Sequence, residues 1–195
     1  MRILPPDPPL TEGLVSLRPW TDRDVPAIAE ACRDDEIARW LDQIPQPYTQ
    51  SDARDYVAMT RRGWKDSTLA AFAIADAASG QVLGSIAVHW FDPGNSAAEV
   101  GYWVGREARG RGVASSALRL VARWAIEDCG LERLQLRADE LNAASQRVAE
   151  NAGFTREGVL RSSRYNPRQG RRVDFVVYSL LRGELCGESS RRRGC

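Results

Sequence analysis

The sequence predicts a single α/β domain in which amphipathic helices pack on one central sheet. Its 195 residues suit one domain and are enough to bury a sizeable hydrophobic core. With 43% hydrophobic and 27% charged residues, the composition is that of an ordinary globular protein. Along the chain, short apolar runs that end at turn residues accompany stretches whose apolar residues recur at helical spacing. These observations favour an α/β fold over a fibrous, disordered or membrane-spanning one.

The first third of the chain is expected to hold an extended arm, one strand and three helical segments. Residues 1–12 are rich in proline and form the arm. After the strand, Thr21 precedes a helix with acidic residues in its first turn. A second proline-rich break precedes Ser51, which we expect to cap the third helical segment. The expected elements are a strand at 14–18, a helix after Thr21, a short helix at 35–41 and a helix from Ser51 to about Trp64.

The remainder of the chain predicts a hairpin-rich sheet interrupted by two helices. A strongly amphipathic helix follows the glycine-rich segment 105–112 and ends near Gly130. The expected strands are 69–74, 82–90, 98–104, 134–138, 157–163 and 173–181, and a last helix is expected at 143–152. The domain then spans 13–182, and the arginine-rich residues 183–195 form a disordered tail.

The charge of the chain argues against nucleic-acid binding as its main function. The formal net charge is +1, and Lys65 is the only lysine. A general electrostatic nucleic-acid binder carries a clear excess of positive charge. The four cysteines lie far apart without a Cys-x-x-Cys pair and accompany a single histidine, so we expect no metal site.

No segment has the pattern of a membrane span or a signal peptide. The apolar runs fall short of the roughly 20 residues that a transmembrane helix needs. The proline-rich start lacks the hydrophobic stretch of a secretory signal. Scattered cysteines suit a reducing compartment. We therefore expect a cytoplasmic protein without a membrane partner.

The segment with the most chemical information is 99–114, a strand that leads through a glycine-rich loop into a helix. Glycines let the backbone approach a ligand closely, and the N–H groups and dipole at a helix start stabilise an anion such as a pyrophosphate. Arg109 and Arg111 add positive charge. A plain strand-to-helix connection is the alternative. A P-loop is excluded because no Gly-Lys-Ser/Thr follows the glycines. A Rossmann loop is excluded because such a loop follows the first strand of a βαβ unit, whereas this segment follows the fourth expected strand.

Two segments in the expected order resemble one enzyme superfamily. Arg109-Gly110-Arg111-Gly112-Val113-Ala114 resembles the Arg/Gln-x-x-Gly-x-Gly/Ala loop with which GNAT acetyltransferases hold the pyrophosphate of CoA. Residues 134–154, with Asn142, Ser145 and Gly153-Phe154, resemble the ribosomal-protein-serine/alanine N-terminal acetyltransferase branch of that superfamily. The order of elements between about residues 13 and 182 is similar to the GNAT fold as well.

The resemblance implies a fold and a reaction. The fold is a central mixed, mostly antiparallel sheet of six to seven strands, with strands 4 and 5 splayed apart and about four flanking helices. The reaction transfers an acetyl group from the co-substrate acetyl-CoA, without a metal, to a primary amine, either a protein N-terminal α-amine or a small-molecule amine. A non-catalytic acyl-CoA-binding sensor or docking module is the alternative. The acyl-chain preference and the oligomeric state are left open, a homodimer included.

The same resemblance assigns residues to the CoA site. The pantetheine arm is expected along the fourth strand, and the pyrophosphate at the glycine loop. Asn142 matches an asparagine that contacts CoA, and it also suits a helix N-cap. The expected cofactor-binding residues are Trp103, Val104, Arg109, Gly110, Arg111, Gly112, Val113, Ala114 and Asn142.

Acetyl transfer to an amine requires a base and an acid, because only the free amine attacks the thioester and the departing thiolate needs a proton. Glu99 matches the glutamate that deprotonates the amine through water in several GNAT enzymes, and an ion-paired carboxylate is the alternative. Ser145 matches the serine that this branch is thought to use as the acid, and a structural helix serine is the alternative. Other members place a tyrosine where this chain has Ala149.

The acceptor pocket is the part that the sequence defines least. Aromatic residues are candidates for its walls, although at this spacing they more often belong to the core. Asp174 is expected to orient the amine or to brace Arg164 or Arg172, and the single histidine faces either the substrate or solvent. The candidate acceptor-binding residues are Trp40, Tyr48, His89, Tyr102, Arg164 and Asp174.

Overall fold

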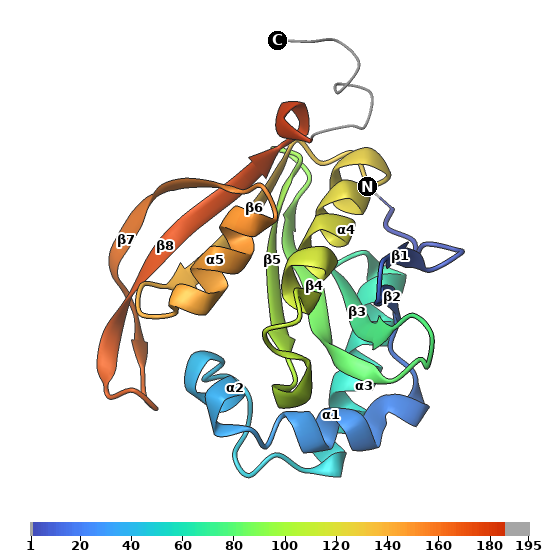
Figure 1. Cartoon of the computed structure of the whole chain (residues 1–195). Helices are drawn as coiled ribbons and strands as arrows, with labels where there is room; N and C mark the ends of the chain where they lie inside the picture. The colour runs from blue at the N-terminus through green and yellow to red at the C-terminus, as the bar shows by residue number, and fades with distance from the viewer. Residues whose placement is uncertain (1, 186–195) are drawn as a thin grey trace.

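One eight-stranded sheet runs through the protein in the computed structural model, which describes residues 2–185 (Figure 1). The strands are β1 (Leu10–Glu12), β2 (Val15–Pro19), β3 (Leu69–Asp76), β4 (Val82–Asp92), β5 (Ala97–Val104), β6 (Arg133–Asp139), β7 (Thr155–Asn166) and β8 (Arg171–Leu181). They lie side by side in the order β1-β2-β3-β4-β5-β6-β8-β7. Neighbouring strands are antiparallel except β5 and β6, which are parallel.

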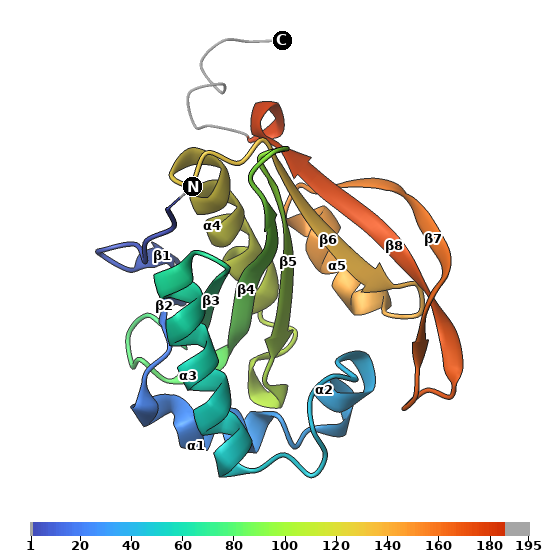
Figure 2. The same ribbon diagram turned by 180° about the vertical axis from the view of Figure 1, so that it is seen from behind.

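Five α-helices accompany the sheet in the described part of the chain. They are α1 (Val25–Ala31), α2 (Asp35–Trp40), α3 (Gln50–Asp66), α4 (Val113–Glu127) and α5 (Ala143–Asn151). α4 and α5 lie on one face of the sheet, α1 and α3 lie on the other, and α2 lies at the end where the sheet opens (Figures 1 and 2). None of the helices within residues 2–185 is both long and apolar enough to cross a membrane.

The expected mixed, mostly antiparallel sheet is confirmed, with one strand more than six to seven. The additional strand is β1, which lies in the segment expected to be an arm and pairs Leu10 with Leu17 of β2. At the other end, Arg182–Glu184 form a 3-10 turn that crosses from the expected domain into the expected tail. Residues 186–195, which make up the rest of that tail, lie outside the described residues.

β3 shows why helices cover both faces of the sheet. Its side chains are apolar on both sides, so both sides are removed from water. Phe72 and Ile74 belong to the large core beneath α4, which includes Leu118. Ala71 and Ala73 belong to a second core with α1 and α3. The small alanine side chains leave room for these two helices to pack close to the strand.

The start of α3 differs from the expectation that Ser51 is its cap. Thr49 is the N-cap, and its hydroxyl accepts a hydrogen bond from the backbone N–H of Asp52 at 3.2 Å. The Asp52 carboxylate accepts one from the Thr49 N–H at 2.8 Å, which completes a capping box. Ser51 lies inside the first turn, because the capping box of Thr49 and Asp52 starts the helix two residues earlier.

β5 and β6 pair over three residues and then separate, as expected for the splayed fourth and fifth strands. Ala97, Ala98 and Glu99 lie opposite residues 133–135 of β6. Beyond Glu99, both strands continue towards α2 and diverge in both views (Figures 1 and 2). On its other side β5 remains paired with β4 as far as Val104. The backbone of β5 from Val100 onwards therefore faces the opening with N–H and C=O groups that a ligand can pair with.

Candidate active site

A cavity of about 1200 Å³ lies where β5 and β6 separate. Its walls come from β4, β5, β6, α2, α5, the loop before α4, the first turn of α4 and part of the β7–β8 hairpin, with single residues of α3 and β3. The sequence-predicted residues in these walls are Glu99, Ser145, Trp103, Val104, Arg109, Gly110, Gly112, Val113, Ala114, Asn142, Trp40, His89, Tyr102 and Arg164. Arg111, Tyr48 and Asp174 lie elsewhere.

The glycine loop before α4 has the geometry of an anion site. Gly110 and Gly112 have φ values of +72° and +76°, a region that residues with a Cβ adopt only with strain. A Cβ at either position would meet no protein atom within 4 Å, so the space above the loop is open. No side chain caps the start of α4 at Gly112. The first N–H groups of the helix therefore remain available, and the loop fits the pyrophosphate expected there.

The two arginines of the loop have different surroundings. Arg109 lines the cavity, where its Nη2 forms an ion pair with Asp34 at 2.5 Å and its Nε donates to the carbonyl of Val104 at 3.2 Å. Asp34 is the N-cap of α2, so this pair connects the glycine loop to that helix. Arg111 lies beside the β3–β4 turn, where hydrogen bonds from Ser79 and, to a smaller degree, the charge of Arg111 lower the pKa of Asp76.

The start of α5 brings Asn142 and Ser145 to the cavity. Asn142 is the N-cap of α5, and its Oδ1 accepts a hydrogen bond from the backbone N–H of Ser145 at 3.0 Å. The hydroxyl oxygen of Ser145 lies 2.9 Å from the hydroxyl of Tyr102 on β5. Burial raises the pKa of Tyr102 to about 12, so its phenol stays protonated at neutral pH. The two hydroxyls form a proton-bearing pair across the opening between β5 and α5.

Tyr102, a candidate acceptor-binding residue, lines the cavity and points towards α5. Alternate residues of a strand point to opposite faces of the sheet. Val100, Tyr102 and Val104 point towards α4 and α5, whereas Glu99 and Trp103 point towards α1 and α3. The ring of Trp103 stacks on Trp20, with 6.5 Å between the ring centroids. The glycine loop and Tyr102 therefore share one face of the opening, and Glu99 lies on the other.

Glu99 lies at the vertex of the opening, the point where β5 and β6 begin to separate. Two neighbours on β6 hold its side chain. Its Oε2 is 2.7 Å from Nε of Arg137 and accepts a hydrogen bond from Nε2 of Gln135 at 3.2 Å. The Arg137 N–H bond is not directed at this oxygen, so the contact is an ion pair without a hydrogen bond. The ion-paired alternative for Glu99 is thus what the structure contains. Sequence reasoning missed Arg137 because only the parallel pairing of β5 with β6 brings it to Glu99.

His89 lies beside Glu99 on the same face, because the two residues are directly opposite each other in the β4–β5 register. Its imidazole is half-buried and lines the cavity. Burial lowers the pKa of His89, while the charge of Glu99 raises it and that of Arg137 lowers it. At neutral pH this imidazole is uncharged and can accept a proton.

A series of aromatic and arginine side chains borders the side of the cavity formed by β6, β7 and β8. The guanidinium of Arg137 lies 4.7 Å from the ring centroid of Trp90 and 5.7 Å from that of Phe175. Arg164 contacts the same Phe175 ring at 5.5 Å and forms an ion pair with Asp42 at 2.8 Å. These contacts join β4, β6, β8 and β7 to the segment after α2.

Two predicted acceptor residues lie away from the cavity. Tyr48 is buried in the core with α1 and α3, because the segment after α2 folds back on α1 and Gln46 donates a hydrogen bond to the carbonyl of Cys32 at 2.9 Å. Asp174 accepts a hydrogen bond from the backbone N–H of Ser162 at 2.6 Å. It braces an irregular stretch of β7 rather than Arg164 or Arg172.

Comparisons with known proteins agree with this geometry. Residues 15–155 match the family model described as an acetyltransferase (GNAT) domain. A Bacillus subtilis relative, "Putative ribosomal N-acetyltransferase YdaF", is 30% identical over 89% of this chain and 94% of its own. "Uncharacterized N-acetyltransferase p20" of Bacillus licheniformis is 28% identical over 91% of this chain and 97% of its own. The structure of Mycobacterium smegmatis RimJ with CoA-disulfide is similar in fold, with a TM-score of 0.83, 21% identity and coverage of 97% and 95% of the two chains.

Proposed function

The chain belongs to the GNAT acetyltransferase family, as an N-acetyltransferase with acetyl-CoA as its donor, and we propose that its acceptor is the α-amine of a protein N-terminus. The name of the Bacillus subtilis relative refers to ribosomal N-acetylation, which supports a protein acceptor. The observation that carries the proposal is a set of contacts that partly closes the side of the cavity next to β7 and β8, which we assign to the acceptor.

The closure consists of polar contacts between the β7–β8 turn and α2. Asn166 and Gln169 each donate a hydrogen bond to the carbonyl of Arg39 at 3.2 Å. Arg168 donates to the carbonyl of Ala38 at 3.1 Å. Because these contacts join two borders of the cavity, they restrict the room for an internal stretch of polypeptide to pass through. A chain end that inserts only its first residues suits such a site.

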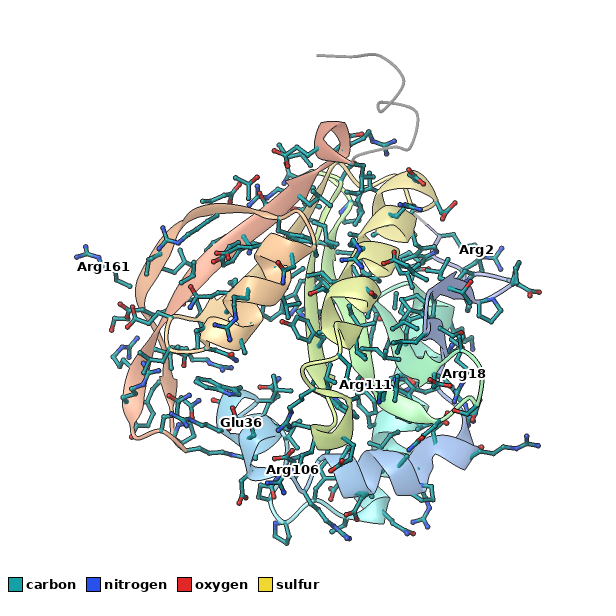
Figure 3. The ribbon with its side chains drawn as sticks, in the orientation of Figure 1. Arg2, Arg18, Glu36, Arg106, Arg111 and Arg161 are labelled. Atoms are coloured by element: carbon teal, nitrogen blue, oxygen red, sulfur yellow. The ribbon has the colours of Figure 1, made fainter. Side chains whose placement is uncertain are left out.

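The charges in the cavity suit an ammonium group. Three carboxylates line it, those of Glu36, Glu99 and Asp139. Glu99 pairs with Arg137 and Asp139 with Arg171, but Glu36 forms no ion pair with any side chain in residues 2–185. Glu36 lies on α2 and accepts a hydrogen bond from Trp40 at 2.9 Å (Figure 3). Its uncompensated charge would attract the cationic chain end towards the cavity.

The donor occupies the other face of the opening in this proposal. Gly110, Gly112 and the first N–H groups of α4 bind the pyrophosphate, with Arg109 beside them and Arg111 supplying charge from outside the cavity. The pantetheine arm pairs with the free edge of β5 at Trp103 and Val104, close to Asn142. This arrangement places the thioester near Tyr102 and Ser145, whose hydroxyls donate a proton to the departing thiolate.

The acceptor approaches from the face that carries Glu99 and His89. The carboxylate of Glu99, fixed by Arg137 and Gln135, favours the ammonium over neutral groups at the vertex. The amine must lose a proton before its lone pair can attack the carbonyl carbon. The amine loses its proton on this face, and the sulfur gains a proton on the opposite face. The two proton transfers are therefore kept apart.

Release of free CoA in the presence of different amines tests the proposal. Peptides with Ser, Ala or Thr at a free N-terminus should release CoA from acetyl-CoA, and the same peptides with a blocked N-terminus should not. Aminoglycosides, polyamines and free amino acids are the comparison set. Release only with one of these small amines would replace the proposed acceptor. We also expect a cytoplasmic protein, and light scattering distinguishes a monomer from a homodimer.

A further inference from the structure

We infer that His89 is the catalytic base that takes the proton from the acceptor ammonium, and that Glu99 acts through it by stabilising the resulting imidazolium. This inference rests on the proposed function in one respect, since it requires an amine acceptor on the Glu99 face. It changes the role of Glu99 from proton acceptor to charge partner.

The contacts of Glu99 make it a poor place for an incoming proton. Both of its partners, Arg137 at 2.7 Å and Gln135 at 3.2 Å, engage the same oxygen, Oε2. Its side chain is only 13% exposed. A proton placed on this carboxylate would leave the guanidinium of Arg137 without its counter-charge in a partly buried site.

His89 has the freedom that Glu99 lacks. Neither imidazole nitrogen forms a hydrogen bond within residues 2–185, and the ring lines the cavity. A Cβ added at Gly101 would lie 3.5 Å from Nε2 of His89. The imidazole therefore reaches over the middle of β5 at the one position where that strand has no side chain. From there Nε2 faces the strand along which the donor lies.

The surroundings of His89 fix its ring and set its protonation. The charged groups that face it are Glu99 from β5 and Arg137 from β6, and its partner on β3 is the apolar Leu69. The ring of Trp90 contacts the imidazole edge to face, with 4.8 Å between centroids. Trp90 has a φ of +50° in the bulge that ends the regular β4–β5 pairing, and such bulges re-aim side chains.

The proton and electron balance of the step is complete with these groups. An ammonium proton moves to the imidazole, the freed lone pair forms the C–N bond, and the nitrogen then loses a second proton to solvent. The C–S bond breaks, and the sulfur takes a proton from the Ser145–Tyr102 pair. The imidazolium, next to Glu99, then loses its proton to solvent, and the hydroxyl pair is reprotonated from solvent. The products are the acetylated amine, CoA thiol and one net proton.

The pH dependence of kcat in H89Q and E99Q tests the inference, with acetyl-CoA and any amine that the wild type acetylates. H89Q should lower kcat by about 100-fold or more and remove the acidic limb of the profile. E99Q should lower kcat less and move that limb to lower pH, because Glu99 raises the pKa of His89. Calorimetric binding of acetyl-CoA should be unchanged in both. The inference would be overturned if H89Q kept the wild-type kcat and the acidic limb of the pH profile while E99Q lost that limb.

A second measurement does not depend on the acceptor. Because the chain has one histidine, its imidazole C–H signal in a proton NMR titration reports His89 alone. We expect a midpoint below 6.5 that falls further in E99Q. Glu132→Gln, which removes an exposed partner of Arg182, is the matched control and should leave the midpoint unchanged. A midpoint that E99Q does not move would contradict the charge partnership. If no peptide is acetylated but this titration behaves as expected, the acceptor proposal fails while the His89 inference stands.

Discussion

The hydroxyl of Tyr102 on β5 lies 2.9 Å from the hydroxyl of Ser145 on α5, and this contact joins the two sides of the opening between that strand and that helix. A serine hydroxyl alone is a weak acid, but here it is paired with the partly buried phenol of Tyr102, which stays protonated. Asn142 fixes Ser145 through the N-cap of α5. We therefore treat the two hydroxyls as one unit that delivers the proton to sulfur.

Removing either hydroxyl should lower kcat through the same step. Y102F and S145A should each reduce kcat by about 10- to 100-fold, and the double variant should lose little more because the two groups act as a unit. Steady-state kinetics with saturating acetyl-CoA measures this, and calorimetry should show unchanged acetyl-CoA binding. Losses that multiply in the double variant would mean that the hydroxyls act independently.

Gly112→Ala should weaken acetyl-CoA binding more than it weakens the fold. Its φ of +76° makes an alanine strained by about 1–2 kcal/mol, and the added Cβ would meet only the bound donor. Gly80→Ala is the matched control, because Gly80 has a φ of +74° in a turn outside the cavity. Both variants should unfold at similarly lower temperatures, but only Gly112→Ala should raise the Kd for acetyl-CoA, by about 10-fold or more. Equal Kd values in the two variants would place the pyrophosphate elsewhere.

Asp34→Asn should tighten acetyl-CoA binding by a few fold. Asp34 competes with the pyrophosphate for Arg109, with which it pairs at 2.5 Å. Asparagine is as good an N-cap as aspartate, so α2 should keep its start. Asp35→Asn, one residue further and without an ion pair in the described residues, is the control. Calorimetric titration checks the change, and a weaker or unchanged affinity would show that Arg109 does not leave Asp34 when the donor binds.

Asp24→Asn should destabilise the fold by about 2–3 kcal/mol, because the buried carboxylate accepts two 2.8 Å hydrogen bonds from Arg18. Burial raises the pKa of Asp24, but hydrogen bonds from Arg18 and Thr21 outweigh it and hold the pKa below its usual value. Because the folded pKa is the lower one, this contribution is present above pH 4 or so and is lost as the pH falls through the folded pKa.

Urea unfolding at several pH values measures this contribution, with Asp22→Asn as the control. Asp22 forms an ion pair with Arg61 at 2.9 Å, but both side chains are largely exposed. Its removal should change the free energy of unfolding by less than about 1 kcal/mol. A loss at Asp24 that is no larger than the loss at Asp22, or that does not shrink in acid, would contradict this account.

Local patterns in the sequence predicted the helices and strands well. Alternating and helical periodicities placed the strands and helices, and the glycines at 110 and 112 marked the anion loop because their positive φ values are a local property of the backbone. The three residues of β1 were too short for a periodic signal. The cap of α3 was misplaced because both Ser51 and Thr49 suit an N-cap, and only the partner Asp52 decides between them.

The acceptor side could not be predicted to the same extent, because its contacts join distant parts of the chain. Arg137 reaches Glu99 only through the parallel pairing of β5 and β6, and Arg164 reaches Asp42 across 122 positions of the chain. The alternation of residues along β5 did not predict that Tyr102 lies on the face of the sheet that carries α5. These relationships depend on register and on the splay, which local patterns do not encode.

The most direct test of the proposed function is to locate the acetyl group on a peptide that offers two amines. A peptide with a free serine N-terminus and one internal lysine is incubated with acetyl-CoA and the protein, and fragmentation mass spectrometry identifies the modified residue. We predict one acetyl group on the α-amine of the first residue and none on the lysine. Acetylation of the lysine, or an unmodified peptide under conditions in which a small amine releases CoA, would contradict the proposal.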